Sequence, residues 1–130
     1  MNDNFRRYIR DNGIRLGPCD GSELQRLRRD VKKEFEALDK YIKYGNQIGL
    51  AASSAIICGL NLKRVKEILG GYEKWFEYEF PESVFPTFQL SRARRYVKFA
   101  EKSATLDLDG PEGIKEIRLQ IGFPDAPSVN

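Results

Sequence analysis

The sequence predicts an all-α protein, a small helical bundle that contains a helix-turn-helix-like unit at residues 71–102. Three observations support this fold class. Apolar residues recur at steps of three and four between residues 22 and 42, which is the spacing of one face of a helix. Glycine and proline pairs separate further segments with the same period. An aromatic segment and a strongly basic segment flank a proline-bounded bend, which is the outline of two helices joined by a turn.

The composition limits the chain to one domain. At 130 residues with 41% hydrophobic and 12% aromatic content, it can bury one ordinary core. We expect a single helical domain at residues 21–123, after a basic N-terminal arm at 1–20 and before a frayed tail at 124–130. The formal net charge is only +3, but residues 104–130 carry two basic and five acidic side chains, so the basic excess lies before them. That excess favours a polyanionic partner.

Several classes of function are excluded by residues that are absent. The chain has no histidine, which excludes imidazole-based triads and histidine-ligated zinc. Cys19 and Cys58 lack a metal-ligand spacing, and no nucleophile–base pair or phosphate loop is present. We therefore expect binding rather than catalysis, with no cofactor and no metal. The N-terminus has no apolar leader, and the longest apolar run, residues 48–60, is shorter than the ~20 residues of a membrane span. These features predict a soluble cytoplasmic protein with no membrane association.

The N-terminal arm is basic and rich in turns. Phe5, Tyr8 and Ile9 have the spacing of one short amphipathic turn. Its arginines either contact phosphate or belong to a mobile arm with a solvated face. They are Arg6, Arg7, Arg10 and Arg15.

A long helix is expected to begin at Ser22, because Ser22 and Gln25 have the spacing of a capping box. Its apolar stripe is narrow and its other faces are densely charged, as in an exposed helix that docks along one seam. This interaction seam consists of Leu24, Leu27, Val31, Phe35, Leu38 and Ile42. We place the end of the helix at Gly45-Asn46. The alternative, one helix that continues through Gly49, would require coiled-coil pairing and hence a dimer.

Residues 47–69 are expected to form the central helix. Their apolar side chains are distributed too widely around the helix for a surface position. Gly45 and Gly49 are expected to let a neighbour approach closely. Lys63 and Arg64 lie in the last, more solvated turns, where cations also suit the helix dipole. The helix then ends at Gly70-Gly71, because glycine adopts the left-handed cap conformation easily.

The next short helix is predicted to direct an aromatic face inward. That face consists of Tyr72, Trp75, Phe76 and Phe80. Trp75, the only tryptophan, is expected to anchor the core rather than to stack on a base. Pro81 and Pro86 then bound a turn that a helix cannot cross without losing backbone hydrogen bonds.

The basic helix that follows has two opposite faces. At about 100° per residue, its apolar residues fall in one arc and most of its cations in the opposite arc. The apolar arc holds Leu90, Ala93, Tyr96, Val97 and Ala100, and the cationic arc holds Arg94, Arg95, Lys98 and Lys102. Such a row of cations can follow a phosphate backbone; the alternative is a solvated face partly neutralised by the acidic C-terminal segment. If the protein reads a specific sequence, Arg92, near the helix start, is the residue expected to reach a base edge.

Residues 104–123 suit either a helix or a hairpin. Alternating apolar residues at 117–123 could pair as a strand with residues 105–108. The helix, which we favour, has Asp109 as its cap and one apolar face. That face consists of Ile114, Ile117 and Ile121.

Three spaced motifs occupy roughly a third of the chain. They are Ala55 with Gly59, Gly71-Tyr72 through Trp75, and Ala93-Arg94-Arg95-Tyr96-Val97-Lys98 to Glu101. Their order and spacing resemble an uncharacterised domain family, a domain of unknown function, in bacterial and phage-encoded proteins. The chain departs from the family pattern at Gln89, where the family has serine, and in its longer connection from Phe80 to Phe88. The resemblance implies an all-helical, helix-turn-helix-like module, often in mobile-element proteins, and brings no biochemical function with it.

The sequence thus predicts a DNA-binding protein of a phage or mobile element, regulatory or replicative, whose basic helix contacts nucleic acid, in the first place duplex DNA. The expected contact residues are Arg92, Arg94, Arg95, Lys98 and Lys102, with backbone support from Lys63 and Arg64. The alternative is a protein-interaction module, a phage or bacterial factor that binds no nucleic acid. In that case the interaction seam would form a homodimer or hold a partner helix.

Overall fold

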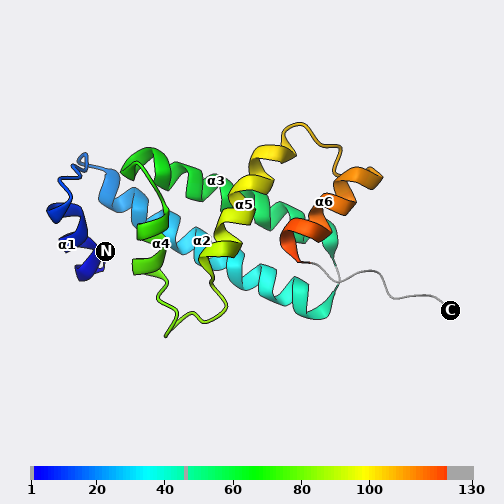
Figure 1. Cartoon of the computed structure of the whole chain (residues 1–130), viewed down its shortest axis with the longest axis horizontal. Coiled ribbons are helices and arrows are strands. Elements are labelled where there is room, and N and C mark those ends of the chain that lie inside the picture. Colours follow the sequence, from blue (N-terminus) through cyan, green and yellow to red (C-terminus); the bar gives the residue numbers. More distant parts are fainter. Residues whose placement is uncertain (1, 46, 123–130) are drawn as a thin grey trace.

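The computed structural model describes residues 2–45 and 47–122, and within them the chain is all-helical, with six helices and no strand (Figure 1). This confirms the predicted fold class. The helices are α1 (Asp3–Asp11), α2 (Asp20–Tyr44), α3 (Ile48–Leu69), α4 (Glu73–Glu79), α5 (Leu90–Ser103) and α6 (Pro111–Ile121). The helices α2 and α3 run in opposite directions as a long pair, and α5 crosses α3 (Figure 1). Residues 123–130, including the tail expected to fray, lie outside the described residues.

The α2–α3 hairpin is made by a helix break at Gly45, as predicted. Gly45 has a φ of +63°, a conformation that favours glycine, and its N–H donates to the carbonyls of Tyr41 and Ile42. The continuous helix that would have required a coiled-coil dimer does not form. The interaction seam of α2 is instead covered inside the chain. Leu24, Leu27, Val31, Phe35 and Leu38 are buried and Ile42 is partly buried. The seam is therefore part of the core and is not free to hold a partner, contrary to the sequence-based interpretation.

The start of α2 differs from the prediction. The helix begins at Asp20, and no side chain caps its free N–H groups, so Ser22 and Gln25 form no capping box. Asp20 instead accepts a hydrogen bond from the Gly17 N–H at 2.7 Å. With Glu23 it also places negative charge in the first turn, where the helix dipole favours it.

The N-terminal arm is folded in residues 3–11, where it forms α1. The Asn2 side chain caps this helix by accepting hydrogen bonds from the N–H groups of Asn4 and Phe5. Phe5 and Ile9 are buried, and the Tyr8 ring lies 5.6 Å from the Tyr78 ring of α4. The Asn2 cap and the packing of aromatic rings on α4 together hold this short helix in place.

The central helix, α3, lies among α2, α5 and α6. Of the helices in the described parts of the chain, it alone has the length and apolar composition of a membrane span. Its packing is that of a core helix, because side chains on several of its faces are inaccessible to solvent. These include Ala51, Ala55, Cys58, Leu62 and Val65.

An aromatic cluster joins α2, α4 and the connection to α5. Trp75, Phe76 and Phe80 are buried, which confirms the predicted inward face and the role of Trp75 as a core anchor. The Phe35 ring of α2 lies 5.5 Å from Phe76 and 4.8 Å from Phe88. Because Phe88 is buried, the long bend between α4 and α5 is held against the core at its far end.

The unit predicted to resemble a helix-turn-helix has both helices, but their connection is long. It covers residues 80–89 between α4 and α5, whereas the turn of a helix-turn-helix has three or four residues. As a result, α5 packs more extensively on α3 than on α4. The angle of α5 is set at Gly59, where an added Cβ would lie 2.7 Å from the Ala100 Cβ and would also collide with the Tyr96 carbonyl.

The C-terminal segment forms the helix α6 and not the hairpin. Its N-cap is Gly110 and its first residue is Pro111, which suits this position because proline lacks the N–H that would have no partner there. Asp109 is not the cap; its own N–H donates to the Asp107 side chain at 3.1 Å. Ile117 and Ile121 are buried, whereas Ile114 is partly exposed.

The two glycines of α3 predict opposite effects of adding one methyl group. Gly59→Ala should lower the free energy of unfolding by roughly 1–3 kcal/mol, because the α3 and α5 backbones must separate. Gly49 has open space where the methyl would go, so it does not mediate the close approach expected of it. Gly49→Ala should leave the stability unchanged or raise it by up to about 1 kcal/mol. Urea unfolding of both variants checks this; equal stabilities would show that α3 and α5 are not in close contact.

Candidate nucleic-acid interface

The helix α5 separates an apolar inner face from a cationic outer face. Ala93, Tyr96, Val97 and Ala100 are buried. The outer face carries four exposed cations, Arg94, Arg95, Lys98 and Lys102. The structure thus brings together four of the cations predicted to contact nucleic acid, and we call this set the α5 cationic face.

The two end members of the α5 cationic face are in ion pairs. Arg94 Nη2 lies 2.9 Å from Glu73 of α4, and Lys102 Nζ lies 2.9 Å from Glu116 of α6. The hydrogen bond with Glu73 raises the pKa of Arg94, and the hydrogen bond from Lys102 lowers the pKa of Glu116. Arg94 and Lys102 are about half exposed, at 55% and 45%, and exposed pairs of this kind contribute little and exchange easily.

The two central members, Arg95 and Lys98, form no ion pair within the described residues. Lys98 contributes to lowering the pKa of Glu116 from a distance. The middle of the α5 cationic face is therefore its least neutralised part. The alternative interpretation, in which acidic side chains neutralise this face, applies only to its two ends.

Arg92 is not placed to reach a base edge. Its side chain is only 15% exposed, and its Nη1 lies 2.7 Å from both Asp39 Oδ1 and the Thr87 carbonyl oxygen. Its Nε and Nη2 donate to the Tyr96 hydroxyl at 3.0 and 2.7 Å. The guanidinium carbon also lies 4.8 Å from the centre of the Phe35 ring. Arg92 therefore joins α2 to α5, a role that sequence position alone did not reveal.

The two supporting cations of α3 also differ from each other. Arg64 makes two hydrogen bonds to the Glu23 carboxylate, and a third to Glu67 at 3.0 Å. The hydrogen bonds from Arg64 to Glu23 lower the pKa of that carboxyl group and tie the end of α3 to the start of α2. Lys63 is partly buried and has no ion-pair partner in the described residues. Only Lys63 of this pair is uncommitted.

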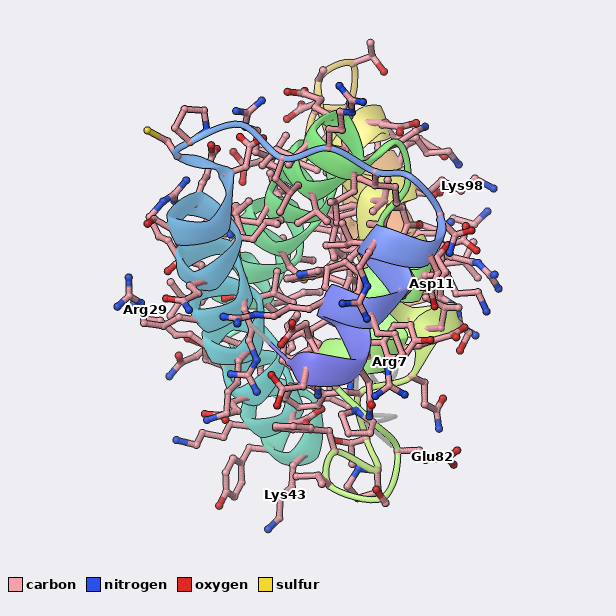
Figure 2. The ribbon with its side chains drawn as sticks, turned by 90° about the vertical axis from the view of Figure 1, so that its left-hand side faces the viewer. Arg7, Asp11, Arg29, Lys43, Glu82 and Lys98 are labelled. Carbon is pink, nitrogen blue, oxygen red and sulfur yellow. The ribbon has the colours of Figure 1, made fainter. Side chains whose placement is uncertain are left out.

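The helix α1 presents a second cationic surface. Arg6, Arg7 and Arg10 are exposed, opposite the buried Phe5 and Ile9, and form no ion pair within the described chain. Figure 2 shows Arg7 and Lys98 on its right-hand half, whereas Arg29 of α2 lies at its left-hand edge. The sequence identified these arginines, but only the Asn2 cap and the docking on α4 show that they are fixed in space.

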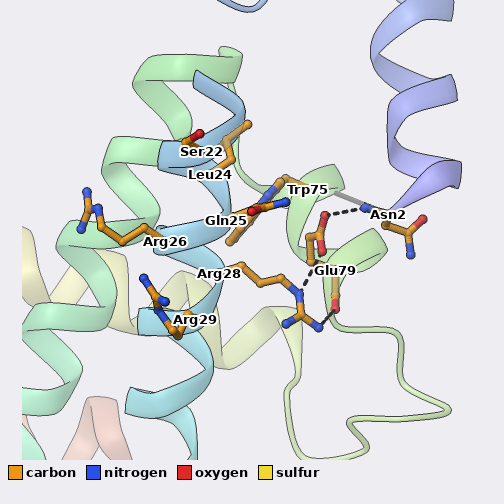
Figure 3. Close-up of a pocket in the computed structure, with 9 residues that line it drawn as sticks. All are labelled: Asn2, Ser22, Leu24, Gln25, Arg26, Arg28, Arg29, Trp75 and Glu79. Carbon is orange, nitrogen blue, oxygen red and sulfur yellow. Dashed lines mark hydrogen bonds and ion pairs between the residues drawn. The ribbon is translucent and has the colours of Figure 1, made fainter. Parts of the chain in front are cut away.

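A polar cleft of about 590 Å³ lies between α2 and α4, beside the start of α1 (Figure 3). Arg28 points across it to Glu79, with Nε at 3.0 Å from Oε2, whereas Arg26 and Arg29 point away (Figure 3). The Glu79 side chain is almost fully buried and its charge is balanced by Arg28. The Arg28–Glu79 ion pair in this cleft therefore joins α2 to α4, and none of the described residues of α5 lines the cleft.

A second cleft, of about 470 Å³, lies between α1, the end of α3 and the start of α4, and Val97 of α5 is also part of its lining. We call it the aromatic cleft. Its lining includes Phe5, Tyr8, Ile14, Leu69, Tyr72 and Trp75, with Lys66, Glu73 and Lys74 among them. Neither cleft was predicted, because each is formed by segments far apart in the sequence.

The two cysteines are unbridged thiols in different surroundings. Cys58 is buried, and burial raises the pKa of its thiol. Cys19 is exposed and unbridged. No group of three or more potential metal-ligating side chains occurs among residues 2–45 and 47–122.

Comparisons with known protein families, with curated proteins and with solved structures find no match. The resemblance to a bacterial and phage domain family therefore remains a prediction.

Proposed function

We propose that this protein binds duplex DNA through the α5 cationic face, as a regulatory or replicative factor of a phage or mobile element, without catalysis and in the cytoplasm. The observation that carries this proposal is the unneutralised centre of that face. Arg95 and Lys98 are exposed on a helix whose opposite side is buried and whose backbone is held against α3.

The arrangement of charge suits a phosphate backbone. Arg94 and Lys102 lie two turns apart on the same side of α5, with Arg95 and Lys98 between them. A phosphate can replace the carboxylate of an exposed ion pair, so all four cations are available to a polyanion, and the released counterions favour binding. The exposed arginines of α1 form a second cationic surface, and Lys63 has no ion-pair partner in the described residues; both are further candidates for phosphate contacts.

The position of Arg92 limits sequence readout. A bidentate arginine contact to a guanine is the commonest specific contact in the major groove, but the Arg92 guanidinium is fully engaged within the protein. Phosphate contacts position a protein on DNA without reading its sequence. We therefore propose binding that depends mainly on charge and shape.

Reversal of the two central charges tests the proposal. Arg95→Glu with Lys98→Glu should weaken binding to a labelled duplex by at least about tenfold. The slope of log K against log salt should become shallower by the amount that corresponds to about two lost phosphate contacts. The matched control is Arg29→Glu with Lys33→Glu, which makes the same charge change on exposed residues of α2. Fluorescence anisotropy at several salt concentrations gives both quantities. Equal loss in the two variants would mean that only net charge matters, and no loss would refute the proposal.

A second candidate function is self-association, through α3 instead of the buried seam of α2. Leu50, Ile57 and Leu60 are about half exposed on one side of α3. No charged residue occurs between residues 44 and 62, so two copies could pack against each other here without burying a charge. Antiparallel pairing of α3 with its copy would place Leu50 opposite Leu60. A single helix face is smaller than the ~800 Å² per partner of a stable complex, so the dimer would be weak.

Light scattering at high protein concentration tests self-association. Ile57→Glu should leave the protein folded, because Ile57 is already half exposed, and should convert any dimer to a monomer. Val84→Glu is the control, since Val84 is exposed in the connection between α4 and α5. A monomeric wild-type protein, or a dimer that survives Ile57→Glu, would exclude this interface.

A further inference from the structure

We infer that the aromatic cleft binds one unpaired nucleobase of DNA whose duplex part lies on the α5 cationic face. This inference rests on the proposed DNA binding and goes beyond it, because it assigns a ligand to a site that charge alone does not reveal. The protein would then recognise a junction between double-stranded and single-stranded DNA.

The cleft adjoins the cationic face directly. Val97, at its edge, lies between Arg94 and Lys98 in sequence and one turn from Arg94 on α5. Glu73, also in the lining, is the residue that pairs with Arg94. A strand whose phosphates contact Arg94 therefore lies beside residues that line the cleft.

The lining suits a base with a phosphate attached. Its walls are mainly aromatic and aliphatic, and Tyr8 is the aromatic ring in it that remains partly exposed. Aromatic rings bind bases by stacking, with little dependence on sequence. Lys66 in the lining is exposed and has no ion-pair partner among the described residues, so it can hold a phosphate beside the base. The volume of about 470 Å³ lies within the usual range for small-molecule sites.

Among the described residues, the lining carries no unpaired negative charge that would repel a base and its phosphate. Tyr72 is a neutral phenol at neutral pH, and burial raises its pKa further. Glu73 is the acid of the lining and is engaged by Arg94. A second phosphate deep in the cleft would meet no cation of the lining other than Lys66 and Lys74, which is itself near Glu77.

Two substitutions alter the cleft without changing charge. Gly71→Leu adds a bulky apolar side chain to the lining of the cleft, and it is tolerated because an added Cβ at Gly71 meets open space and the backbone there has no positive φ. Tyr8→Leu removes the stacking ring and keeps an apolar side chain. The matched controls are Gly49→Leu, also in open space but at the other end of α3, and Tyr44→Leu, an exposed tyrosine at the end of α2.

The test compares a blunt duplex with the same duplex carrying a single-stranded overhang of about six nucleotides, within the usual span of single-strand sites. Anisotropy should show that the overhang tightens binding by roughly 5- to 100-fold, the range expected for one stacked base. Gly71→Leu should abolish this gain and leave the affinity for the blunt duplex unchanged. Tyr8→Leu should also abolish the gain, and it should weaken binding of the blunt duplex slightly, because Tyr8 also helps to hold α1 on α4. The two controls should keep the gain.

Trp75 provides an independent readout, because it is the only tryptophan and lines the cleft. The overhang DNA should quench its fluorescence and the blunt duplex should not. Trp75 also borders the polar cleft, so loss of quenching in Gly71→Leu assigns the signal to the aromatic cleft. Binding of both DNAs with equal affinity and no quenching would overturn this inference and leave the proposed function intact. Failure of both DNAs to bind would overturn the two together.

Discussion

The outward direction of the α5 cations depends on the contacts by which Arg92 joins α5 to α2. Its guanidinium lies on the Phe35 ring, binds Asp39, and holds the Tyr96 hydroxyl in the next turn of its own helix. The Thr87 hydroxyl also donates a hydrogen bond to Asp39, so the Asp39 carboxylate fixes the end of the long connection as well. A planar donor with several N–H groups can make these contacts together, whereas lysine cannot. These contacts of Arg92 fix the rotation of α5 about its own axis.

That rotation decides which cations remain outside. With Arg92 and Tyr96 directed inward and Gly59 admitting the α5 backbone to α3, Arg95 and Lys98 must face solvent. The neighbouring aromatic cleft has a separate structural origin. The cleft exists because α1 is docked on α4 by Phe5, Tyr8 and Tyr78, which closes a wall next to Val97.

Local sequence signals predicted the helices well and their partners less well. The break at Gly45, the inward Trp75 and the two faces of α5 follow from helical period and glycine chemistry, and the structure has all three. The proposal that the α2 seam binds a partner was wrong. An apolar stripe such as Leu27 to Leu38 has the same sequence pattern whether it packs on the same chain or on another. Arg92 was misassigned for a similar reason: Asp39 lies 53 residues away, and no local pattern reports that contact. The two clefts depend on tertiary packing and were not predicted.

Arginine side-chain NMR with and without duplex DNA tests most directly the division of α5 into an inward clamp and an outward cationic face. The Nε–H signal of Arg92 should be protected from solvent exchange and should not move when DNA is added, whereas the Arg95 signal should shift. A large shift of the Arg92 signal with an unchanged Arg95 signal would contradict the account, because it would place the clamp residue on the DNA.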